Sequence, residues 1–240
     1  MRNPDAPRSA LFVGGCGQSF HLLEPAVEPV REALEAAGFD VTVEGIWHPD
    51  GPREPIDGDY SILSRGGLRG HDLLVLFTTG SGYGEDVDAI GDFVRSGGGL
   101  LGIHCAADSF THAHDWVALI GGAFKTHPAP LDIDVEIVDP DHPITAGVDP
   151  FTIHDELYVF RDYFPGHVHL LARTTSHDAG DGKAIPVAWT RSEGRGRVFY
   201  LSLGHFPEAM RHPSWQRMVA NGAAWAVGVP GPPPPIVEPD

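Results

Sequence analysis

The chain has 240 residues, 42% of them hydrophobic, and a formal net charge of −17. This length and composition suit one sizeable core, so we expect a single domain rather than two. The acidic excess argues against a nucleic-acid or anionic-membrane surface, because both need clustered lysine and arginine.

The sequence also argues against a membrane protein and against a secreted one. The longest apolar runs, such as LLVLF at 73–77, fall short of the roughly 18 residues that a spanning helix needs. The first residues lack the apolar core of a signal peptide. Cys16 and Cys105 are the only cysteines, which excludes a disulfide framework. We therefore expect a cytoplasmic protein.

The first half of the chain alternates between strand and helix patterns. The predicted elements are a strand at 9–15, a helix at 24–38, strands at 39–45 and 71–80, a helix at 86–99 and a strand at 100–105. The strand at 71–80 is continuously apolar, which is typical of a strand buried on both faces. This alternation predicts a parallel sheet with helices on both sides.

The second half is richer in strands. They are predicted at 131–139, 153–160, 167–175, 185–191 and 197–204, and a final helix at 214–228 is expected to bury Trp215, Met218, Val219 and Trp225. We therefore predict one α/β domain over 1–229, an open, doubly wound, mostly parallel sheet with added antiparallel strands. The proline-rich segment 230–240 is predicted to be a peripheral tail.

In such a sheet, ligands bind beyond the carboxyl ends of the strands. Three glycine-rich or polar loops, 14–21, 78–86 and 104–110, follow predicted strands and should form the pocket. The GSGYGE segment at 80–85 lacks the spacing of a phosphate-binding loop, so no nucleotide cofactor is expected.

The segment GIHCA at 102–106 has the spacing of a nucleophile elbow, with small residues two positions either side of His104. Cys105 comes one position late, and its side chain should therefore point elsewhere. Other histidines lie at comparable places: His21 ends the first loop and His205 follows a predicted strand, while Glu156 lies in the polar segment IHDELY. Such a set suits general acid–base chemistry or a metal site.

Several segments occur in the order seen in the ThuA-like (trehalose utilisation) family, which the chain resembles from about residue 10 to residue 228. These segments are DLLVLFTTG, FVRSGGGLLGIHCAAD, GGAFKTHP, DHPITAG, DELYVF, PVAWTRSEGRGRVFYLSLGH and ANGAAWAVG. The resemblance implies a flavodoxin-like fold of the class I glutamine amidotransferase type, without the cysteine of that class at the elbow. It also implies a role in the catabolism of disaccharides and keto-sugars. The functional candidates carried over from the family are His21, His104, His127, Glu156 and His205.

The leading hypothesis is an enzyme that acts on a disaccharide-derived or keto-sugar by acid–base or metal-assisted elimination, isomerisation or hydrolysis. His104, Glu156 and His205 are the predicted catalytic residues. They are also the predicted ligands of one divalent ion such as zinc or manganese, with His21 or His127 as a further ligand. The residues predicted to bind substrate are His21, Tyr83, Asp108 and His127.

Three alternatives stay open at this point. The protein could be a cysteine-dependent, amidotransferase-like hydrolase that uses Cys105 and His205, or a sugar-binding protein without catalysis. The histidines could also bond to one another and to sugar hydroxyls with no ion. Four aromatic residues are candidates for stacking on a sugar ring, although each also suits the core: Phe20, Tyr83, Phe110 and Trp116. A homodimer is expected for an α/β protein of this size.

Overall fold

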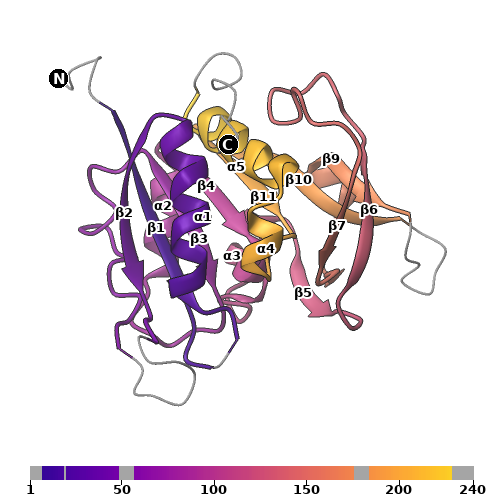
Figure 1. Cartoon of the computed structure of the whole chain (residues 1–240). Helices are drawn as coiled ribbons and strands as arrows, with labels where there is room; N and C mark the ends of the chain where they lie inside the picture. The colour runs from indigo at the N-terminus through magenta and orange to yellow at the C-terminus, as the bar shows by residue number, and fades with distance from the viewer. Residues whose placement is uncertain (1–6, 19, 49–56, 176–183, 229–240) are drawn as a thin grey trace.

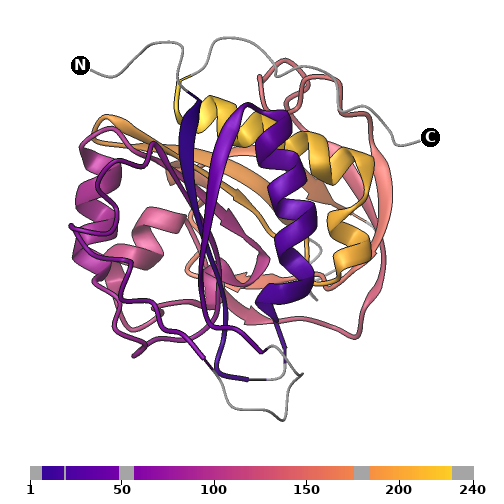
Figure 2. The ribbon, with the colours of Figure 1, turned by 60° about the vertical axis from the view of Figure 1, so that its left-hand side comes forward.

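The computed structural model describes residues 7–18, 20–48, 57–175 and 184–228, and its centre is a nine-stranded sheet with the order β2-β1-β3-β4-β11-β10-β9-β6-β7 (Figure 1). Helices cover both faces of the sheet (Figures 1 and 2). Within the described residues, no helix is long and apolar enough to cross a bilayer. The predicted tail at 230–240 lies outside the described residues.

One half of the sheet is parallel. Its strands are β2 (Phe39–Gly45), β1 (Arg8–Gly15), β3 (Leu73–Thr78), β4 (Gly99–Ile103) and β11 (Gly196–Leu201). β3 is buried along its whole length, as its continuous apolar sequence predicts. Because β1 is followed by β2 on one side and has β3 on the other, the winding reverses between β1 and β3. The predicted doubly wound α/β class is confirmed.

The other half of the sheet is antiparallel. Its strands are β10 (Ile185–Glu193), β9 (His169–Thr174), β6 (Leu131–Ile137) and β7 (Phe151–Asp155). In the sheet order β11, β10, β9, β6, β7, each strand runs antiparallel to the one before it. After four reversals β7 runs the same way as β11, so the carboxyl ends of β7 and of the parallel strands point to the same edge.

The helices form two layers whose apolar faces complete separate cores. α1 (Leu23–Ala36) packs beside α5 (Pro213–Ala226), and the short α4 (Pro207–Met210) contacts both, whereas α2 (Val87–Arg95) and α3 (His114–Ile120) cover the opposite face. Strand residues alternate between these cores: Phe12 joins the first and Leu11 the second, as the two-residue period of a strand requires.

The prediction of one strand over 153–160 is wrong. β7 ends at Asp155, and the chain then leaves the main sheet to form β8 (Val159–Arg161), which pairs with β5 (Ala123–Thr126) in a separate two-stranded sheet. Glu156 therefore lies where the chain crosses from one sheet to the other. The pattern was misleading because the apolar residues of the connecting segment and of β8 follow those of β7 without a glycine or proline turn signal between them.

Smaller differences concern short elements and one side chain. The sequence patterns did not reveal α3 or β5, or the 3₁₀ turns η1 (His104–Asp108) and η2 (Pro165–His167). Trp215, Met218 and Val219 are buried as predicted. Trp225 is only half-buried, because it lies at the end of α5 with the guanidinium of Arg197 over its ring at 5.2 Å.

Candidate active site

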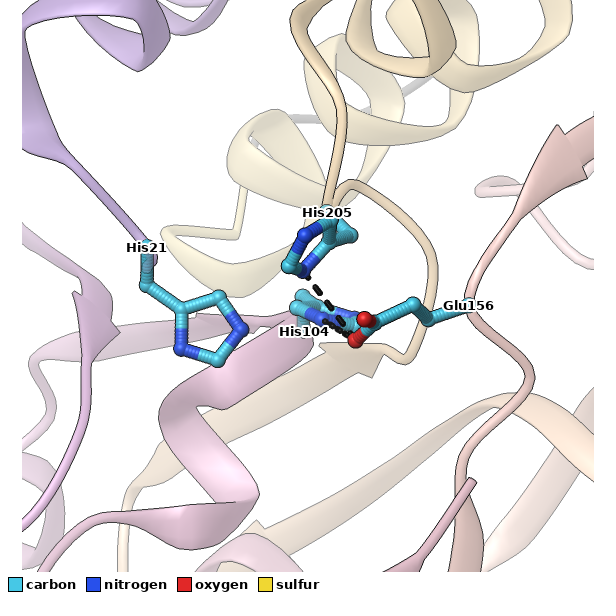
Figure 3. A group of neighbouring side chains, drawn as sticks. All are labelled: His21, His104, Glu156 and His205. Atoms are coloured by element: carbon cyan, nitrogen blue, oxygen red, sulfur yellow. Dashed lines mark ion pairs between the residues drawn. The ribbon is translucent and has the colours of Figure 1, made fainter. Parts of the chain in front are cut away.

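Four side chains that follow four different strands meet at the carboxyl edge of the sheet. His21 comes after β1, His104 after β4, Glu156 after β7 and His205 after β11 (Figure 3). One potential ligand atom from each residue can be chosen so that all four atoms lie within 4.8 Å of one another. The sheet reversal at β1 and β3 places this group where ligands bind in open α/β sheets.

The turn after β4 presents His104 as the elbow spacing predicts. His104 has a φ of +43°, a left-handed conformation that residues other than glycine rarely adopt. A Cβ atom at Gly102, in the strand before the turn, would lie 2.6 Å from Ile120 Cδ1 and 3.3 Å from Ala106 Cβ, so a side chain there would force Ile120 to shift. His21 also has a positive φ, of 54°. Backbone strain of this kind concentrates at functional sites.

The three imidazole rings form a compact triangle. Their centroids are 5.0 Å apart for His21 and His104, 5.0 Å for His21 and His205, and 5.3 Å for His104 and His205. The ring planes are inclined to one another by 72° to 77°. None of the three pairs is stacked, and one nitrogen of each ring lies within 4.8 Å of the others and of a Glu156 carboxylate oxygen.

Glu156 closes this triangle with a single carboxylate oxygen. Its Oε2 lies 3.4 Å from His104 Nε2 and 3.1 Å from His205 Nδ1, and Figure 3 shows both contacts. Burial alone raises the pKa of Glu156, but the imidazoles of His104 and His205 that face its carboxylate outweigh burial and hold the pKa well below its usual range. The carboxylate is therefore ionised.

The proton on His104 can be placed from its partner. Nδ1 lies 2.7 Å from the backbone carbonyl oxygen of Ser202, which can only accept, so Nδ1 carries the hydrogen. In the neutral ring Nε2 then has a free lone pair that faces Glu156. Nε2 is buried without a hydrogen-bond partner, and so is His205 Nδ1.

His205 is fixed by its backbone as well as by its ring. The buried carboxylate of Asp155 accepts hydrogen bonds from the backbone N–H of Gly204 at 2.5 Å and of His205 at 3.0 Å. Burial raises the pKa of Asp155. These contacts show that the antiparallel half curls back until the end of β7 meets the end of β11.

His21 is positioned by two hydroxyl groups. Its Nδ1 lies 2.8 Å from Thr79 Oγ1, and its Nε2 lies 3.4 Å from the hydroxyl of Tyr158. Burial, reinforced by the neighbouring imidazoles His104 and His205, lowers the pKa of His21 to about 2. The ring is therefore neutral. Tyr158 also packs against His104, with ring centroids 4.0 Å apart.

His127 and Asp108 lie at the border of the group. His127 Nε2 is 3.7 Å from Glu156 Oε1, and 35% of the side chain is exposed. Its Nδ1 lies 2.8 Å from the carbonyl oxygen of Pro128 and so carries the hydrogen. Asp108 ends η1 half-buried; burial raises its pKa, while Arg161 and His104 act in the opposite direction.

Other predicted residues lie elsewhere. The ring of Tyr83 packs on Tyr60 at 5.1 Å, and its hydroxyl lies against Gly17; the structure gives it no contact with the four-residue group. Phe110 and Trp116 are buried in the core beside each other, 5.2 Å between centroids. Cys105 is 0% exposed, and burial raises the pKa of its thiol well above the ordinary value. Neither property suits a nucleophile.

The sequence reasoning missed Asp155, Thr79 and Tyr158 as supporting residues. Each stands next to a predicted feature: Asp155 directly precedes Glu156, Tyr158 follows two residues after it, and Thr79 lies in the predicted loop 78–86. The polar segment IHDELY contained the only signal for Asp155 and Tyr158. Which carboxylate of that segment faces the histidines depends on the end of β7, which the pattern did not reveal.

The donor set fits a divalent metal ion. Three imidazole nitrogens and one carboxylate oxygen are ligands that zinc and related ions accept, with bonds near 2.1 Å that place neighbouring ligand atoms about 3 to 4 Å apart. The distances from Glu156 to His104 and His205, 3.4 and 3.1 Å, fall in that range. His21 belongs to this set, and His127 lies outside it.

Comparison with known proteins gives a consistent family and fold. The sequence profile of the ThuA family, described as trehalose utilisation, matches residues 10–226. A ThuA-like protein from Parabacteroides merdae superposes with a TM-score of 0.75 at 20% identity, covering 92% of this chain and 90% of the neighbour. One from Bacteroides uniformis gives 0.69 at 22% identity, covering 97% and 98%.

A third similar structure bears on the fold class. A Thermoplasma acidophilum protein described as part of a GMP synthase superposes with a TM-score of 0.52 at 13% identity, covering 91% of this chain and 96% of the neighbour. Among curated proteins, no sequence matches this chain. The structural likeness confirms the predicted glutamine amidotransferase-like fold.

Proposed function

The chain belongs to the ThuA (trehalose utilisation) family, and we propose that it is a metal-dependent enzyme of sugar metabolism that acts on a keto-sugar. The family supports a role in sugar metabolism. The metal, the keto-sugar and the reaction are our proposal. The proposed ion is zinc or manganese, and the proposed ligands of this ion are His21, His104, Glu156 and His205.

One observation carries the metal proposal. Glu156 Oε2 faces His104 Nε2 and His205 Nδ1, and both nitrogens are buried without a hydrogen-bond partner. Because His104 Nδ1 already donates to Ser202, a neutral His104 turns a lone pair toward the carboxylate. A lone pair and an anion repel each other, so this arrangement requires either added protons or a cation between them. A divalent ion satisfies all of these atoms together.

A bound divalent ion supplies Lewis-acid polarisation of a carbonyl oxygen or acidification of water. The protein's own contribution is to hold the ligands rigidly. Thr79 fixes the ring of His21 and the Ser202 carbonyl fixes that of His104, while Asp155 fixes the backbone of His205. Such supporting contacts set ring orientation and ligand basicity in metal sites.

We assign the proton-transfer role to His127. A C–H bond beside a ketone is acidic, so elimination or isomerisation of a keto-sugar needs one base near the carbonyl. The Nδ1 hydrogen of His127 is held by Pro128, which leaves Nε2 free to accept a proton beside Glu156. This ring is more exposed than any of the four proposed ligands, so it can reach both substrate and solvent. Asp108 is assigned to a sugar hydroxyl.

Two alternatives from the sequence lose support, and one remains as an outcome of the test. The buried thiol of Cys105 opposes the cysteine-dependent hydrolase. A cluster held by hydrogen bonds alone is opposed by His104 Nε2 and His205 Nδ1, because both nitrogens face Glu156 Oε2 without a hydrogen-bond partner. A sugar-binding protein without catalysis would use the same pocket, so it must be separated by measuring turnover.

The test is turnover with and without metal. Protein treated with a chelator and protein reloaded with zinc or manganese are incubated with a keto-glycoside, and the sugar is followed by NMR. We expect conversion only after reloading. A bound but unchanged keto-glycoside would instead support the binding protein, and equal conversion without metal would overturn the metal proposal. The homodimer also remains a prediction, which a solution mass equal to one 25.8 kDa chain would contradict.

A further inference from the structure

A cavity with mostly apolar side chains around it opens beside two of the four clustered residues. It has a volume of about 160 Å³ and reaches the rings of His21 and His205. The other lining side chains are apolar and come from the segment before α1, from α1, from β3 and from α4: Phe20, Leu22, Pro25, Ala26, Phe77, Pro207 and Met210. Neither Asp108 nor His127, the polar residues assigned to the substrate, lines it.

This lining is unsuited to a sugar ring. Sugar hydroxyl groups need hydrogen-bond partners, and burying a hydroxyl without one costs roughly 1 to 3 kcal/mol on the scale of protein variants. Apart from the two imidazoles, the cavity wall offers only carbon-rich side chains. The occupant should therefore be an apolar group that is attached to the reacting sugar.

The size and the wall both favour one aromatic ring. An apolar cavity of about 150 Å³ is known to hold benzene, so about 160 Å³ suits a phenyl-sized group. Aromatic edges line the space: the ring of His21 is perpendicular to that of Phe20 at 5.1 Å and inclined by 73° to that of Phe77 at 5.9 Å. Such rings pack well against another aromatic ring, edge to face or offset.

Phe20 is an exposed aromatic residue in the lining of this space. It is 39% exposed, one of three large hydrophobic side chains left exposed among the described residues. An exposed phenylalanine beside an apolar cavity and two candidate metal ligands gains burial when an apolar group enters. We propose that the cavity is an aglycone subsite, and that the substrate class is an aryl glycoside, oxidised to a keto-sugar, whose aromatic group lies between Phe20, Phe77 and Ala26.

The keto-sugar part of this proposal rests on the proposed function, whereas the binding of an aromatic ring in the cavity does not. The test separates these two parts. Phenol, phenyl keto-glucoside and methyl keto-glucoside are each titrated into the protein loaded with metal, and the backbone amide signals of Ala26 and Met210 are followed by NMR. We expect phenol to shift these signals, and the phenyl glycoside to bind about 10- to 100-fold more tightly than the methyl one.

Two variants test the position of the ring, each with a matched control. Ala26→Leu fills the cavity and should weaken phenol binding at least about tenfold, whereas Ala36→Leu, at the last residue of the same helix and outside the cavity, should not. Phe20→Ala removes one side of the cavity and should also weaken phenol binding, whereas Phe164→Ala, which changes an exposed phenylalanine elsewhere, should not. Phe20→Ala keeps the test decisive if Ala26→Leu fails to fold.

The outcomes are distinct. Phenol that leaves both amide signals unmoved, or that binds equally well to Phe20→Ala, would overturn the aglycone subsite. Equal affinities for the phenyl and methyl glycosides would overturn it as well. If phenol binds in the cavity while neither glycoside binds, the cavity assignment holds for aromatic rings but the keto-sugar function is wrong.

Discussion

Asp155 holds the backbone of His205, and Glu156, the residue after Asp155 in the chain, faces the ring of His205. Asp155 accepts the His205 N–H at 3.0 Å, while Glu156 Oε2 lies 3.1 Å from His205 Nδ1. Two consecutive residues at the end of β7 thus position one histidine that follows β11. This link also joins the antiparallel half of the sheet to the parallel half at the site.

Replacing Asp155 by asparagine should weaken metal binding. The amide retains one accepting oxygen but places an NH₂ group against backbone N–H donors, so Gly204 or His205 loses its partner. We expect the free energy of unfolding to fall by about 1 to 3 kcal/mol and metal affinity to fall about 10- to 100-fold. Urea unfolding and metal titration measure the two effects.

The matched control is His154→Asn, on the same strand. His154 is exposed and bonds only to Asp132 at the surface among the hydrogen bonds described, at 2.8 Å. The His154→Asn substitution should change neither the free energy of unfolding nor the metal affinity appreciably. An Asp155→Asn protein with unaltered metal affinity would show that the Asp155 contacts do not position His205 for the ion.

Replacing Cys105 by alanine should leave turnover intact. The thiol is fully buried in the core and its pKa is raised by burial, so it acts as a small apolar group. A loss of stability of about 1 kcal/mol is expected from the lost volume. Complete loss of turnover in a folded Cys105→Ala protein would restore the cysteine-dependent hydrolase.

Replacing His127 by glutamine should separate chemistry from metal binding. His127 lies outside the ligand set and is assigned as the base, so we expect turnover to fall roughly 10²- to 10⁴-fold with the metal content unchanged. His112→Gln, an exposed histidine elsewhere, serves as the control. If the ion is lost together with turnover, His127 is a ligand rather than a base.

Replacing Tyr83 by alanine should leave KM for a keto-glycoside unchanged. The sequence predicts that Tyr83 binds substrate, but its ring packs on Tyr60 and its hydroxyl lies against Gly17. A KM raised severalfold, in a protein of unaltered stability, would return Tyr83 to the substrate site.

The sequence was most informative where chemistry and local conformation coincide. The spacing of small residues around His104 predicts a strained turn, and the structure has His104 at a φ of +43°. Histidines placed after buried strands should meet at one edge of a parallel sheet, and His21, His104 and His205 do. These inferences need only the direction of the strands and the residues that follow them.

The sequence could not reveal how the antiparallel half folds back. β7 is the edge strand farthest from β2, yet Asp155 at its end contacts Gly204 after β11. That contact depends on sheet curvature, which no short pattern encodes. The division of 153–160 into two strands was hidden for a similar reason, since periodicity shows which residues are buried but not which partner strand buries them. The four residues of β5 are too few for any period to be visible.

The metal content of the protein tests the central claim most directly. Protein purified without chelator and then supplied with zinc or manganese is passed through a desalting column and analysed by mass spectrometry of its elements. The expected result is one divalent ion per chain, lost in a folded His104→Ala protein and retained in His154→Ala. Wild-type protein that holds no ion, or a His104→Ala protein that still holds one, would contradict the proposed site.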